Sequence, residues 1–459
     1  MTRIAIIGGG PAGYEAALVA VQLGAQVSLI DRDGVGGQCV LADCVPSKTF
    51  IATSEAMTTF SHADRVGVHT EGTVSTVVDE VNARVKALAL AQSTDITLRL
   101  AKEGVELLHG SARLTAPGRV EVTTDEGPQV VEADAVLLAT GAHPRVVPGA
   151  TPDGERILDW RQLYDLPELP THLVVVGSGV TGAEFANAYN AMGSAVTLVS
   201  SRERVLPGED SDAAELLQTV FERRGMQIRR GRAAGVQRTA DGVRVELTDG
   251  TVVEGSHCLM TVGSVPNTDG LGLEEVGVRR TDGGFVEVDR VSRTSVPGVY
   301  AAGDCTGVLM LASVAAMQGR IAMWHALGEA VAPLRLGTVS ANVFTDPQVA
   351  SVGVTQQQVE TGAVTANAVT LPLATNARAK MQGLTDGFVK FFCRPGTGTV
   401  LGGVVVAPGA SELVMPMSLA VQHGLTVDQI AHTFAIYPSL SGSVTEAARQ
   451  LMLHGEDRG

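Results

Sequence analysis

Short apolar runs and glycine-rich turns alternate near the N-terminus and predict a strand–helix–strand unit. Residues 4–7 are apolar (Ile-Ala-Ile-Ile), and residues 8–13 read Gly-Gly-Gly-Pro-Ala-Gly. A helical pattern then continues to Gly24, and a second mostly apolar run follows at residues 27–31. Short apolar runs bounded by turn residues are typical of buried strands, whereas the longer periodic segment between them is typical of a helix.

The same unit occurs a second time in the chain. Residues 173–176 are apolar, residues 177–182 read Gly-Ser-Gly-Val-Thr-Gly, a helical pattern reaches Gly193, and residues 196–200 form another strand-like run. In a Gly-x-Gly-x-x-Gly loop the first glycine makes a tight turn, the second lets a pyrophosphate approach the backbone, and the third lets helix and strand pack closely. Two matches in the same context favour two dinucleotide-binding domains.

One position distinguishes the two copies. Eighteen residues after the third glycine, the first copy has Asp31 and the second has Ser200. A carboxylate there accepts hydrogen bonds from a ribose diol. In the second copy the missing acid, Ser200 and the nearby Arg202 and Arg204 suit a 2′-phosphate, so this site is predicted to accept NADPH as well as NADH. The alternative is a solvent-exposed basic turn that binds nothing.

Composition limits the class of protein. A chain of 459 residues with 45% hydrophobic residues and 53 glycines is typical of a globular α/β protein of two to four domains. Its net charge of -15 argues against nucleic-acid binding, because phosphates would not be neutralised. No apolar run approaches the roughly 20 residues that a membrane-spanning helix needs. With no leader-like segment before the first strand, we expect a cytoplasmic protein without an integral membrane segment.

Five cysteines are too few, and odd in number, for a disulfide scaffold. Three of them are isolated among apolar or small residues, and we expect them to be buried, inert thiols: Cys258, Cys305 and Cys393.

The other two cysteines, Cys39 and Cys44, are four residues apart and precede a helical pattern at residues 49–56. This spacing is compatible with a disulfide. A helix N-terminus and the nearby Lys48 would lower the pKa of a thiol at this place and favour a reactive thiolate. In a cytoplasmic protein such a pair is more often catalytic than structural. The sequence around the pair supplies no further Cys or His for a metal site, and none is expected.

With these motifs the chain resembles the pyridine nucleotide–disulfide oxidoreductase family, which includes dihydrolipoamide dehydrogenase, glutathione reductase and mercuric reductase. The resemblance covers essentially the whole chain. It rests on five stretches: residues 8–13, residues 36–48 (Gly-Gly-x-Cys to Cys-Val-Pro-Ser-Lys), residues 139–141 (Ala-Thr-Gly), residues 300–304 (Tyr-Ala-Ala-Gly-Asp) and residues 343–353.

The resemblance implies that the first glycine loop holds FAD and the second holds NADPH or NADH. The FAD residues would be Gly8, Gly10, Pro11, Ala12, Gly13, Asp31, Gly37, Lys48, Gly110, Thr140, Gly141, Gly303 and Asp304. The NAD(P)H residues would be Gly177, Gly179, Val180, Gly182, Glu184, Ser200, Arg202 and Gly263. Val180 stands where the family has an aromatic gate over the flavin, so that gate is not expected here.

The same resemblance assigns catalytic roles. Cys44 would face the flavin and Cys39 would meet the substrate. Lys48 would lie near flavin N5, with Glu184 as its ion-pair partner beside the nicotinamide, and a cation there stabilises the negative charge of the reduced ring. Asp304 would hydrogen-bond the ribityl or pyrophosphate region of FAD.

The C-terminal segment departs from the family. Disulfide-reducing members carry His-Pro-Thr-x-x-Glu, whose His from the other subunit acts as acid and base, but here Tyr437 and Gly442 replace the His and the Glu. A phenol with an ordinary pKa of ~10 is a poor proton carrier near neutral pH. His432 lies five residues upstream as a candidate substitute. We expect Tyr437 to be a packing residue with a satisfied hydroxyl.

Three functions are compatible with this pattern. The first is an FAD-dependent NAD(P)H oxidoreductase that reduces a quinone-like acceptor, as in the actinobacterial branch of dihydrolipoamide dehydrogenase-like quinone reductases, which the segments at residues 310–319 and 437–446 resemble. That branch can lack the first cysteine, which this chain keeps as Cys39. The second is a dihydrolipoamide dehydrogenase or another disulfide reductase with an atypical acid/base. The third is a non-catalytic flavin redox sensor.

The expected fold is α/β, with two Rossmann-like dinucleotide-binding domains, for FAD and NAD(P), and a C-terminal α+β dimerisation domain. Residues 1–148 and 269–335 would form the FAD domain, 149–268 the NAD(P) domain, and 336–459 the dimerisation domain, strand-rich first and then helical. The family pattern implies a homodimer.

Overall fold

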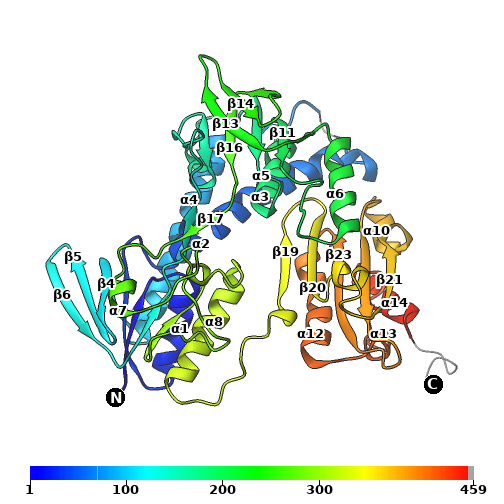
Figure 1. The fold of residues 1–459 in the computed structure, drawn as a ribbon. Coiled ribbons are helices and arrows are strands. Elements are labelled where there is room, and N and C mark those ends of the chain that lie inside the picture. Colours follow the sequence, from blue (N-terminus) through cyan, green and yellow to red (C-terminus); the bar gives the residue numbers. More distant parts are fainter. Residues whose placement is uncertain (70, 453–459) are drawn as a thin grey trace. The chain divides into compact units, whose positions relative to one another are not determined.

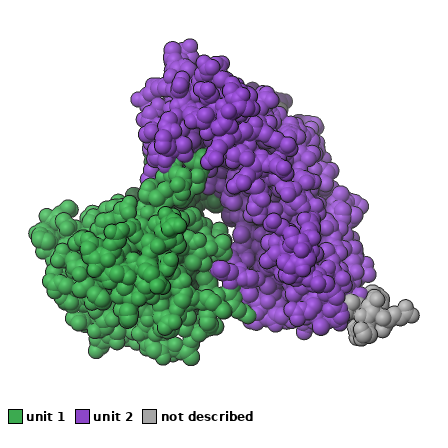
Figure 2. Space-filling view, in the orientation of Figure 1, with its two compact units in different colours: residues 1–50, 80–145, 262–335 green, residues 51–79, 146–261, 336–459 purple. Residues whose placement is uncertain are grey.

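The computed structural model describes residues 1–69 and 71–452 (Figure 1), so residues 453–459 of the expected dimerisation domain lie outside it. The chain divides into two compact units, which Figure 2 shows in different colours. Unit 1 comprises residues 1–50, 80–145 and 262–335, and unit 2 comprises residues 51–79, 146–261 and 336–459. The finer division into three domains stays a prediction.

Unit 1 is built on the first strand–helix–strand repeat. Its main sheet has five parallel strands in the order β18-β7-β1-β2-β3. These strands are β1 (Arg3–Ile7), β2 (Gln26–Asp31), β3 (Glu106–His109), β7 (Ala135–Leu138) and β18 (Val299–Ala301). The helices are α1 (Pro11–Gln22), α2 (Gly37–Leu41), α4 (Val78–Lys102), α7 (Leu273–Val276) and α8 (Ala312–Ala326), with α3 (Cys44–Ser61) continuing from unit 1 into unit 2.

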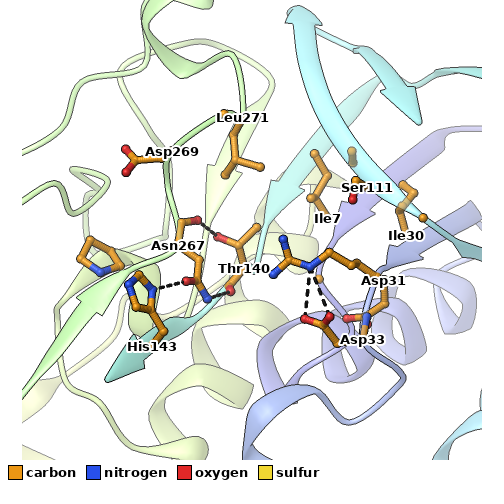
Figure 3. Close-up of a pocket in the computed structure, with 16 residues that line it drawn as sticks. Ile7, Ile30, Asp31, Asp33, Ser111, Thr140, His143, Asn267, Asp269 and Leu271 are labelled. Atoms are coloured by element: carbon orange, nitrogen blue, oxygen red, sulfur yellow. Dashed lines mark hydrogen bonds and ion pairs between the residues drawn. The ribbon is translucent and has the colours of Figure 1, made fainter. Parts of the chain in front are cut away.

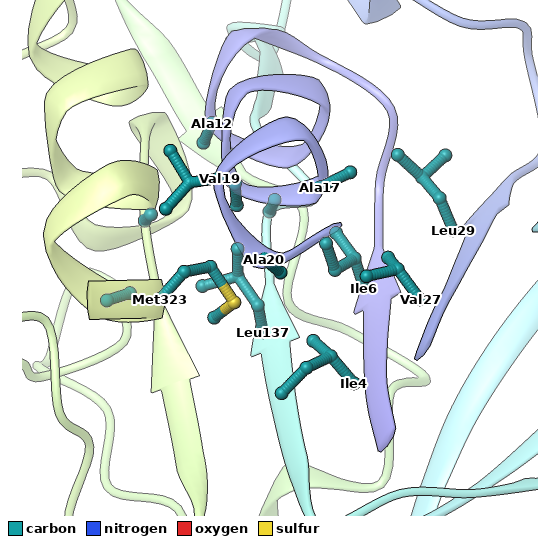
Figure 4. Packing of buried hydrophobic residues seen from close by; sticks show 14 of the residues in the cluster. Ile4, Ile6, Ala12, Ala17, Val19, Ala20, Val27, Leu29, Leu137 and Met323 are labelled. Carbon is teal, nitrogen blue, oxygen red and sulfur yellow. The ribbon is translucent and has the colours of Figure 1, made fainter. Parts of the chain in front are cut away.

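Both faces of this sheet are covered. Successive strand residues point to opposite sides, so each strand contributes to both faces. Ile4 and Ile6 of β1 pack in a cluster with residues of α1 and α8 (Figure 4), whereas Ala5 and Ile7 pack in a second cluster on the other face. The two helices touch closely, since a Cβ on Gly319 of α8 would lie 2.1 Å from the carbonyl oxygen of Ala12 in α1.

Smaller sheets complete unit 1. An antiparallel meander consists of β4 (Ser111–Ala116), β5 (Arg119–Thr124) and β6 (Gly127–Glu132). A two-stranded ribbon pairs β8 (Ala142–Pro144) with β17 (Ser264–Pro266).

The second repeat forms the corresponding sheet of unit 2, in the order β12-β11-β10-β16-β9. Its parallel strands are β9 (Ile157–Asp159), β10 (His172–Val176), β11 (Ala195–Ser200), β12 (Gln227–Arg230) and β16 (His257–Met260). The helices are α5 (Val180–Ala191) and α6 (Ser211–Arg223). An antiparallel meander consists of β13 (Ala233–Arg238), β14 (Val243–Leu247) and β15 (Val252–Gly255).

The C-terminal part of unit 2 is an antiparallel sheet followed by helices, and we call it the interface domain (residues 336–452). The strand order is β19-β20-β23-β22-β21. The strands are β19 (Ser340–Val343), β20 (Gln348–Gly353), β21 (Asn367–Pro372), β22 (Phe388–Cys393) and β23 (Val400–Ala407). The helices are α9 (Gln356–Glu360), α10 (Ala377–Met381), α11 (Ala410–Leu413), α12 (Met415–His423), α13 (Val427–Ala431) and α14 (Gly442–Gln450). The predicted fold class is confirmed.

Candidate functional site

The first glycine loop places the start of α1 against the carboxyl end of β1. Gly8 has a φ of 108°, and a Cβ there would lie 2.2 Å from the carbonyl oxygen of Ala139. A Cβ on Gly13 would lie 1.9 Å from the carbonyl oxygen of Gly8. Gly10 caps α1 without a side-chain hydrogen bond, and Pro11 begins the helix. The N–H groups of the first turn therefore remain available to an anion.

Asp31, at the end of β2, is held in place by the same loop. Its carboxylate accepts hydrogen bonds from the backbone N–H groups of Gly9 at 2.6 Å, Asp33 at 2.8 Å and Gly34 at 2.6 Å. A carboxylate offers about four acceptor sites, so one remains for a ribose hydroxyl.

A cavity of about 290 Å³ opens beside Asp31 (Figure 3). It brings together four of the predicted FAD residues, namely Gly8, Asp31, Gly110 and Thr140. The residues present fit a dinucleotide, with backbone N–H groups for its pyrophosphate and an oriented acid for its ribose.

Two residues that line this cavity, His143 and Asn267, were missed by the sequence analysis. The Thr140 hydroxyl donates to the Asn267 carbonyl at 2.6 Å, and Asn267 Nδ2 donates to the Thr140 carbonyl at 2.8 Å. His143 Nδ1 lies 2.6 Å from Asn267 Oδ1. A signal was available, because residues 141–144 and 263–266 both read Gly-x-x-Pro and form the paired strands β8 and β17.

The cysteine segment packs directly against the first glycine loop. Gly37, which begins α2, has a φ of 56°, and a Cβ there would lie 2.8 Å from Cα of Gly10. The N–H of Gly36 donates to the carbonyl of Gly9 at 2.8 Å. Cys39 lies in α2 and Cys44 begins α3, and both are near enough to Tyr14 of α1 to raise its pKa.

Both cysteines are free thiols in this structure and half-buried. The pKa of the Cys44 thiol is raised far above its ordinary value, first by its hydrogen bond with Cys39 and then by burial and the charge of Asp43. The charge of Lys48 lowers this pKa, but by less than the other effects raise it. The expected lowering of the thiol pKa is therefore wrong for Cys44, because these local terms outweigh the cation. The three isolated cysteines are fully buried, as expected.

Asp304 follows the positive-φ residue Gly303 after β18. Burial, assisted by the charge of Asp43, raises the pKa of its carboxyl to about 6. The N–H of Gly303 donates to Oε1 of Gln318 at 2.9 Å. Gln318 is a third residue that the sequence analysis missed, and it fixes this turn from helix α8. Asp304 is partly buried, and among the described residues no hydrogen-bond donor to its carboxyl lowers this pKa, which fits a hydroxyl-rich ligand.

The second glycine loop repeats the geometry of the first. Gly177 has a φ of 116°, and a Cβ there would lie 2.3 Å from the carbonyl oxygen of Thr261. A Cβ on Gly182 would lie 1.9 Å from the carbonyl oxygen of Gly177. Gly179 caps α5 without a side-chain bond, and the following Val180 is 43% exposed. The backbone again fits a pyrophosphate.

Two further candidates belong to different units. Lys48 lies in unit 1, and Glu184 lies in α5 of unit 2, where it is buried. Glu184 Oε1 accepts a 2.9 Å hydrogen bond from the N–H of Phe344. Gly263 has a φ of 96° and lies in unit 1, where its carbonyl accepts from the N–H of Arg145.

The Ser200 hydroxyl forms hydrogen bonds that hold the turn after β11. Ser200 is buried, its hydroxyl lies 2.7 Å from the Ser178 hydroxyl, and it accepts from the N–H of Arg202 at 3.1 Å. Among the described residues, the exposed Arg202 guanidinium has no ion-pair partner, whereas Arg204 pairs with Glu215 at 3.2 Å. Arg202 is thus the residue of this turn that is most available to an anion.

The segment between α13 and α14 is exposed in the single chain. Phe434, Ile436 and Tyr437 are 102%, 81% and 86% exposed. The expectation that Tyr437 packs is not met within the chain, because the segment extends away from the interface-domain core. His432 is also exposed, with Nδ1 2.7 Å from the Asp428 carbonyl, and Gly442 begins α14.

No group of three His, Cys, Asp or Glu side chains is arranged to hold a metal ion anywhere in residues 1–69 and 71–452. In the same part of the chain, no helix combines the length and the apolar character needed to cross a bilayer.

Comparisons with known proteins agree with this geometry. Residues 2–319 match the model of the pyridine nucleotide-disulphide oxidoreductase family, and residues 339–448 match that of its dimerisation domain. The chain is 57% identical to an NAD(P)H dehydrogenase (quinone) of Mycobacterium tuberculosis, over 99% of this chain and 95% of that protein. It is 35% identical to a dihydrolipoyl dehydrogenase of Chlorobaculum tepidum, over 97% and 96%. A crystal structure of LpdA from Mycobacterium tuberculosis matches with a TM-score of 0.95 and 57% identity, over 99% of this chain and all of that one.

Proposed function

Since the chain belongs to the pyridine nucleotide-disulphide oxidoreductase family, whose cofactors are FAD and NAD(P)H, we propose that it is an NAD(P)H dehydrogenase that reduces a quinone. The observation that carries the proposal is the replacement of the family's His and Glu by Tyr437 and Gly442, because reduction of a disulfide needs proton transfer to the leaving sulfur. The M. tuberculosis relative is named as a quinone enzyme, which supports the same choice.

The missing acid/base affects the reduction of disulfides more than the reduction of quinones. Tyr437 and Gly442 stand where disulfide-reducing relatives would need a His and a Glu. Proton transfer by a positioned side chain typically contributes 10²–10⁴-fold, so reduction of a small disulfide would be slow. A quinone that takes its electrons directly from the flavin does not depend on that step.

The residues of this chain have simple roles in the proposal. FAD, when bound, would supply the electron transfer from NAD(P)H to the acceptor. The N-terminus of α1 and the oriented Asp31 carboxylate bind its ADP part, and Asp304 accepts from its hydroxyl groups. Lys48 would supply positive charge to the flavin, and Glu184 would orient the nicotinamide. The loop after β11 binds the nicotinamide nucleotide, with Arg202 as the ligand of a 2′-phosphate.

The retained cysteine pair keeps one alternative open. Cys39 and Cys44 are close enough to share a hydrogen bond, which is the geometry a disulfide reductase requires. Reduction of lipoamide or of another disulfide is therefore the second candidate, and the C. tepidum relative is named as such an enzyme.

We further infer a homodimer that uses the exposed segment at residues 434–437. The matched dimerisation domain covers this segment, and a run of large apolar residues this exposed marks a contact surface. Five free cysteines in the described chain also fit a reducing compartment, so we place the enzyme in the cytoplasm.

A comparison of acceptors tests the proposal. The FAD-loaded protein is mixed with NADPH or NADH and with menadione, lipoamide or no acceptor, and nucleotide oxidation is followed. We expect rapid turnover with menadione and slow turnover with lipoamide. Faster turnover with lipoamide than with menadione would falsify the quinone proposal, and a lack of turnover with every acceptor would favour a redox sensor.

A further inference from the structure

A buried ammonium group connects the interface domain to the nucleotide-binding part of unit 2. Lys390 lies in β22, and its Nζ is 2.8 and 2.9 Å from the two carboxylate oxygens of Asp210 and 2.7 Å from Asp212 Oδ2. It also contacts Oε1 of Gln356. The side chains of Lys390 and Asp210 are each only 3% exposed. A pair so well shielded from water is strongly destabilised when one partner is removed.

Asp210 serves a second purpose at the same time. Its Oδ1 accepts from the N–H groups of Asp212 at 3.1 Å and Ala213 at 3.2 Å, and so caps the N-terminus of α6. The residue is therefore the fixed point at which the loop after β11 ends and α6 begins. We call residues 201–209 the arginine loop.

The other end of the arginine loop is fixed by the second glycine loop. Ser200 and Ser178 share a hydrogen bond between their hydroxyl groups, and the N–H of Leu206 donates to the Ser178 carbonyl at 2.8 Å. Leu206 has a φ of 52° and is buried. A leucine in the left-handed region is strained, so the loop holds this shape only because its surroundings impose it.

Acidic residues crowd the end of the loop. Glu209 precedes Asp210 and is partly buried, with a carboxylate oxygen 3.5 Å from the Ser351 hydroxyl. Burial and the neighbouring charge of Asp210 raise the pKa of Glu209. The Lys390 ammonium, hydrogen-bonded to both oxygens of Asp210, is the group that holds this carboxylate inside the protein. Without it, we expect Asp210 to turn towards water and release the end of the loop.

We propose that Lys390 is a positioning residue for NADPH, which holds Asp210 so that the arginine loop presents Arg202 to the 2′-phosphate. The inference rests on the nucleotide site proposed above. The ammonium acts at a distance from the nucleotide, through a helix cap and a strained loop. Its loss should therefore weaken binding of the 2′-phosphate selectively, because the pyrophosphate loop at residues 177–182 is held by other contacts.

The test is the affinity of the FAD-loaded Lys390→Met variant for NADP⁺ and NAD⁺, measured by calorimetry. Loss of one charge-assisted phosphate contact corresponds to about a tenfold to hundredfold weaker affinity, so we expect that change for NADP⁺ and less than about threefold for NAD⁺. The KM for NADPH should rise with little change in kcat. An unchanged ratio of the two affinities, even with a lower Tm, would show that Lys390 has only a structural role and overturn the proposal.

The chain offers a matched control and a rescue. Arg223 and Asp386 form an ion pair between the same helix α6 and the same domain, but at the far end of the helix and more exposed. Arg223→Gln should leave the affinity ratio unchanged, and an equal shift in this variant would contradict the proposal. The double variant Lys390→Met/Asp210→Asn keeps a capping side chain without a buried charge, and it should recover most of the NADP⁺ affinity.

If Lys390→Met does not fold, Asp210→Ala alone answers the same question. It removes both the cap of α6 and the buried partner of the ammonium, so the ratio should shift in the same direction, and a constant ratio would overturn the inference. Wild-type protein that binds NAD⁺ but not NADP⁺ would also overturn it, while leaving the quinone proposal intact. Tight NADP⁺ binding without menadione reduction would instead contradict the quinone proposal alone.

Discussion

The backbone N–H of Phe344 donates a 2.9 Å hydrogen bond to Oε1 of Glu184. Phe344 follows β19 of the interface domain, whereas Glu184 lies in α5 beside the second glycine loop. Asn187, one turn further along α5, binds Arg224 and the N–H of Asp346 from the same segment. The interface domain thus fixes the orientation of the carboxylate that we assign to the nicotinamide.

Replacing Glu184 with Gln keeps its shape and its acceptor oxygen but removes the charge. We expect flavin reduction by NADPH to slow by about 10²-fold, because a preorganised electrostatic contact is lost. Stopped-flow absorbance of the flavin measures this step directly. The exposed acid Glu222 provides a control, since Glu222→Gln should leave the rate as it is. Equal rates in wild-type and Glu184→Gln protein would remove Glu184 from the mechanism.

The two glycine loops can be separated by matched substitutions. Gly8→Ala and Gly177→Ala each introduce a Cβ 2.2–2.3 Å from a carbonyl oxygen at a residue with positive φ. The first should yield protein with little bound FAD, and the second should yield yellow protein that binds NADP⁺ and NAD⁺ weakly. Flavin absorbance and calorimetry report the two effects. The assignment of the loops is wrong if Gly177→Ala loses FAD while Gly8→Ala retains it.

The cysteine pair should be dispensable for quinone reduction. In Cys44→Ser, electrons can still leave from the flavin, so steady-state menadione reduction should stay within about threefold of wild type. Cys305→Ser, at a buried thiol, controls for the effect of the substitution itself. Loss of menadione reduction in Cys44→Ser alone would show that the electrons pass through the sulfurs.

Asp304 should make the stability of FAD-free protein depend on pH. Its carboxyl has a folded pKa of about 6, above the ordinary value of 3.8. The folded state therefore binds the proton more tightly, so this contribution is complete below pH ~4 and is lost as the pH rises through ~6. A difference of about two pKa units corresponds to roughly 3 kcal/mol at most. The Tm of wild type should fall relative to that of Asp304→Asn between pH 4 and 7, and parallel curves would contradict this.

The exposed apolar segment should hold the dimer together. Phe434→Glu places a charge where we expect a subunit contact, so the protein should become monomeric at micromolar concentration in light-scattering chromatography. Val130→Glu, at an exposed position of β6, should leave the oligomeric state unchanged. A Phe434→Glu protein that remains dimeric would exclude this segment from the interface.

The sequence predicted those features that depend on local signals. Both repeats were found because glycine positions and β-branched runs are confined to about thirty residues each. The links between Thr140 and Asn267 or between Lys390 and Asp210 join residues 127 and 180 positions apart, and no local pattern marks them. The pKa of Cys44 was predicted in the wrong direction. The hydrogen bond with Cys39 and the charge of Asp43 raise it by more than Lys48 lowers it, and the distances that decide this balance are known only from the folded structure.

The bond from Phe344 to Glu184 also limits how this chain can be recombined. A nicotinamide-binding segment cut out as residues 149–268 would leave its partner N–H behind, along with the Lys390 ammonium. Grafts into other flavoproteins should therefore carry strands β19 and β22 with the segment. In this enzyme the set of segments that must be transferred together is larger than the nucleotide fold.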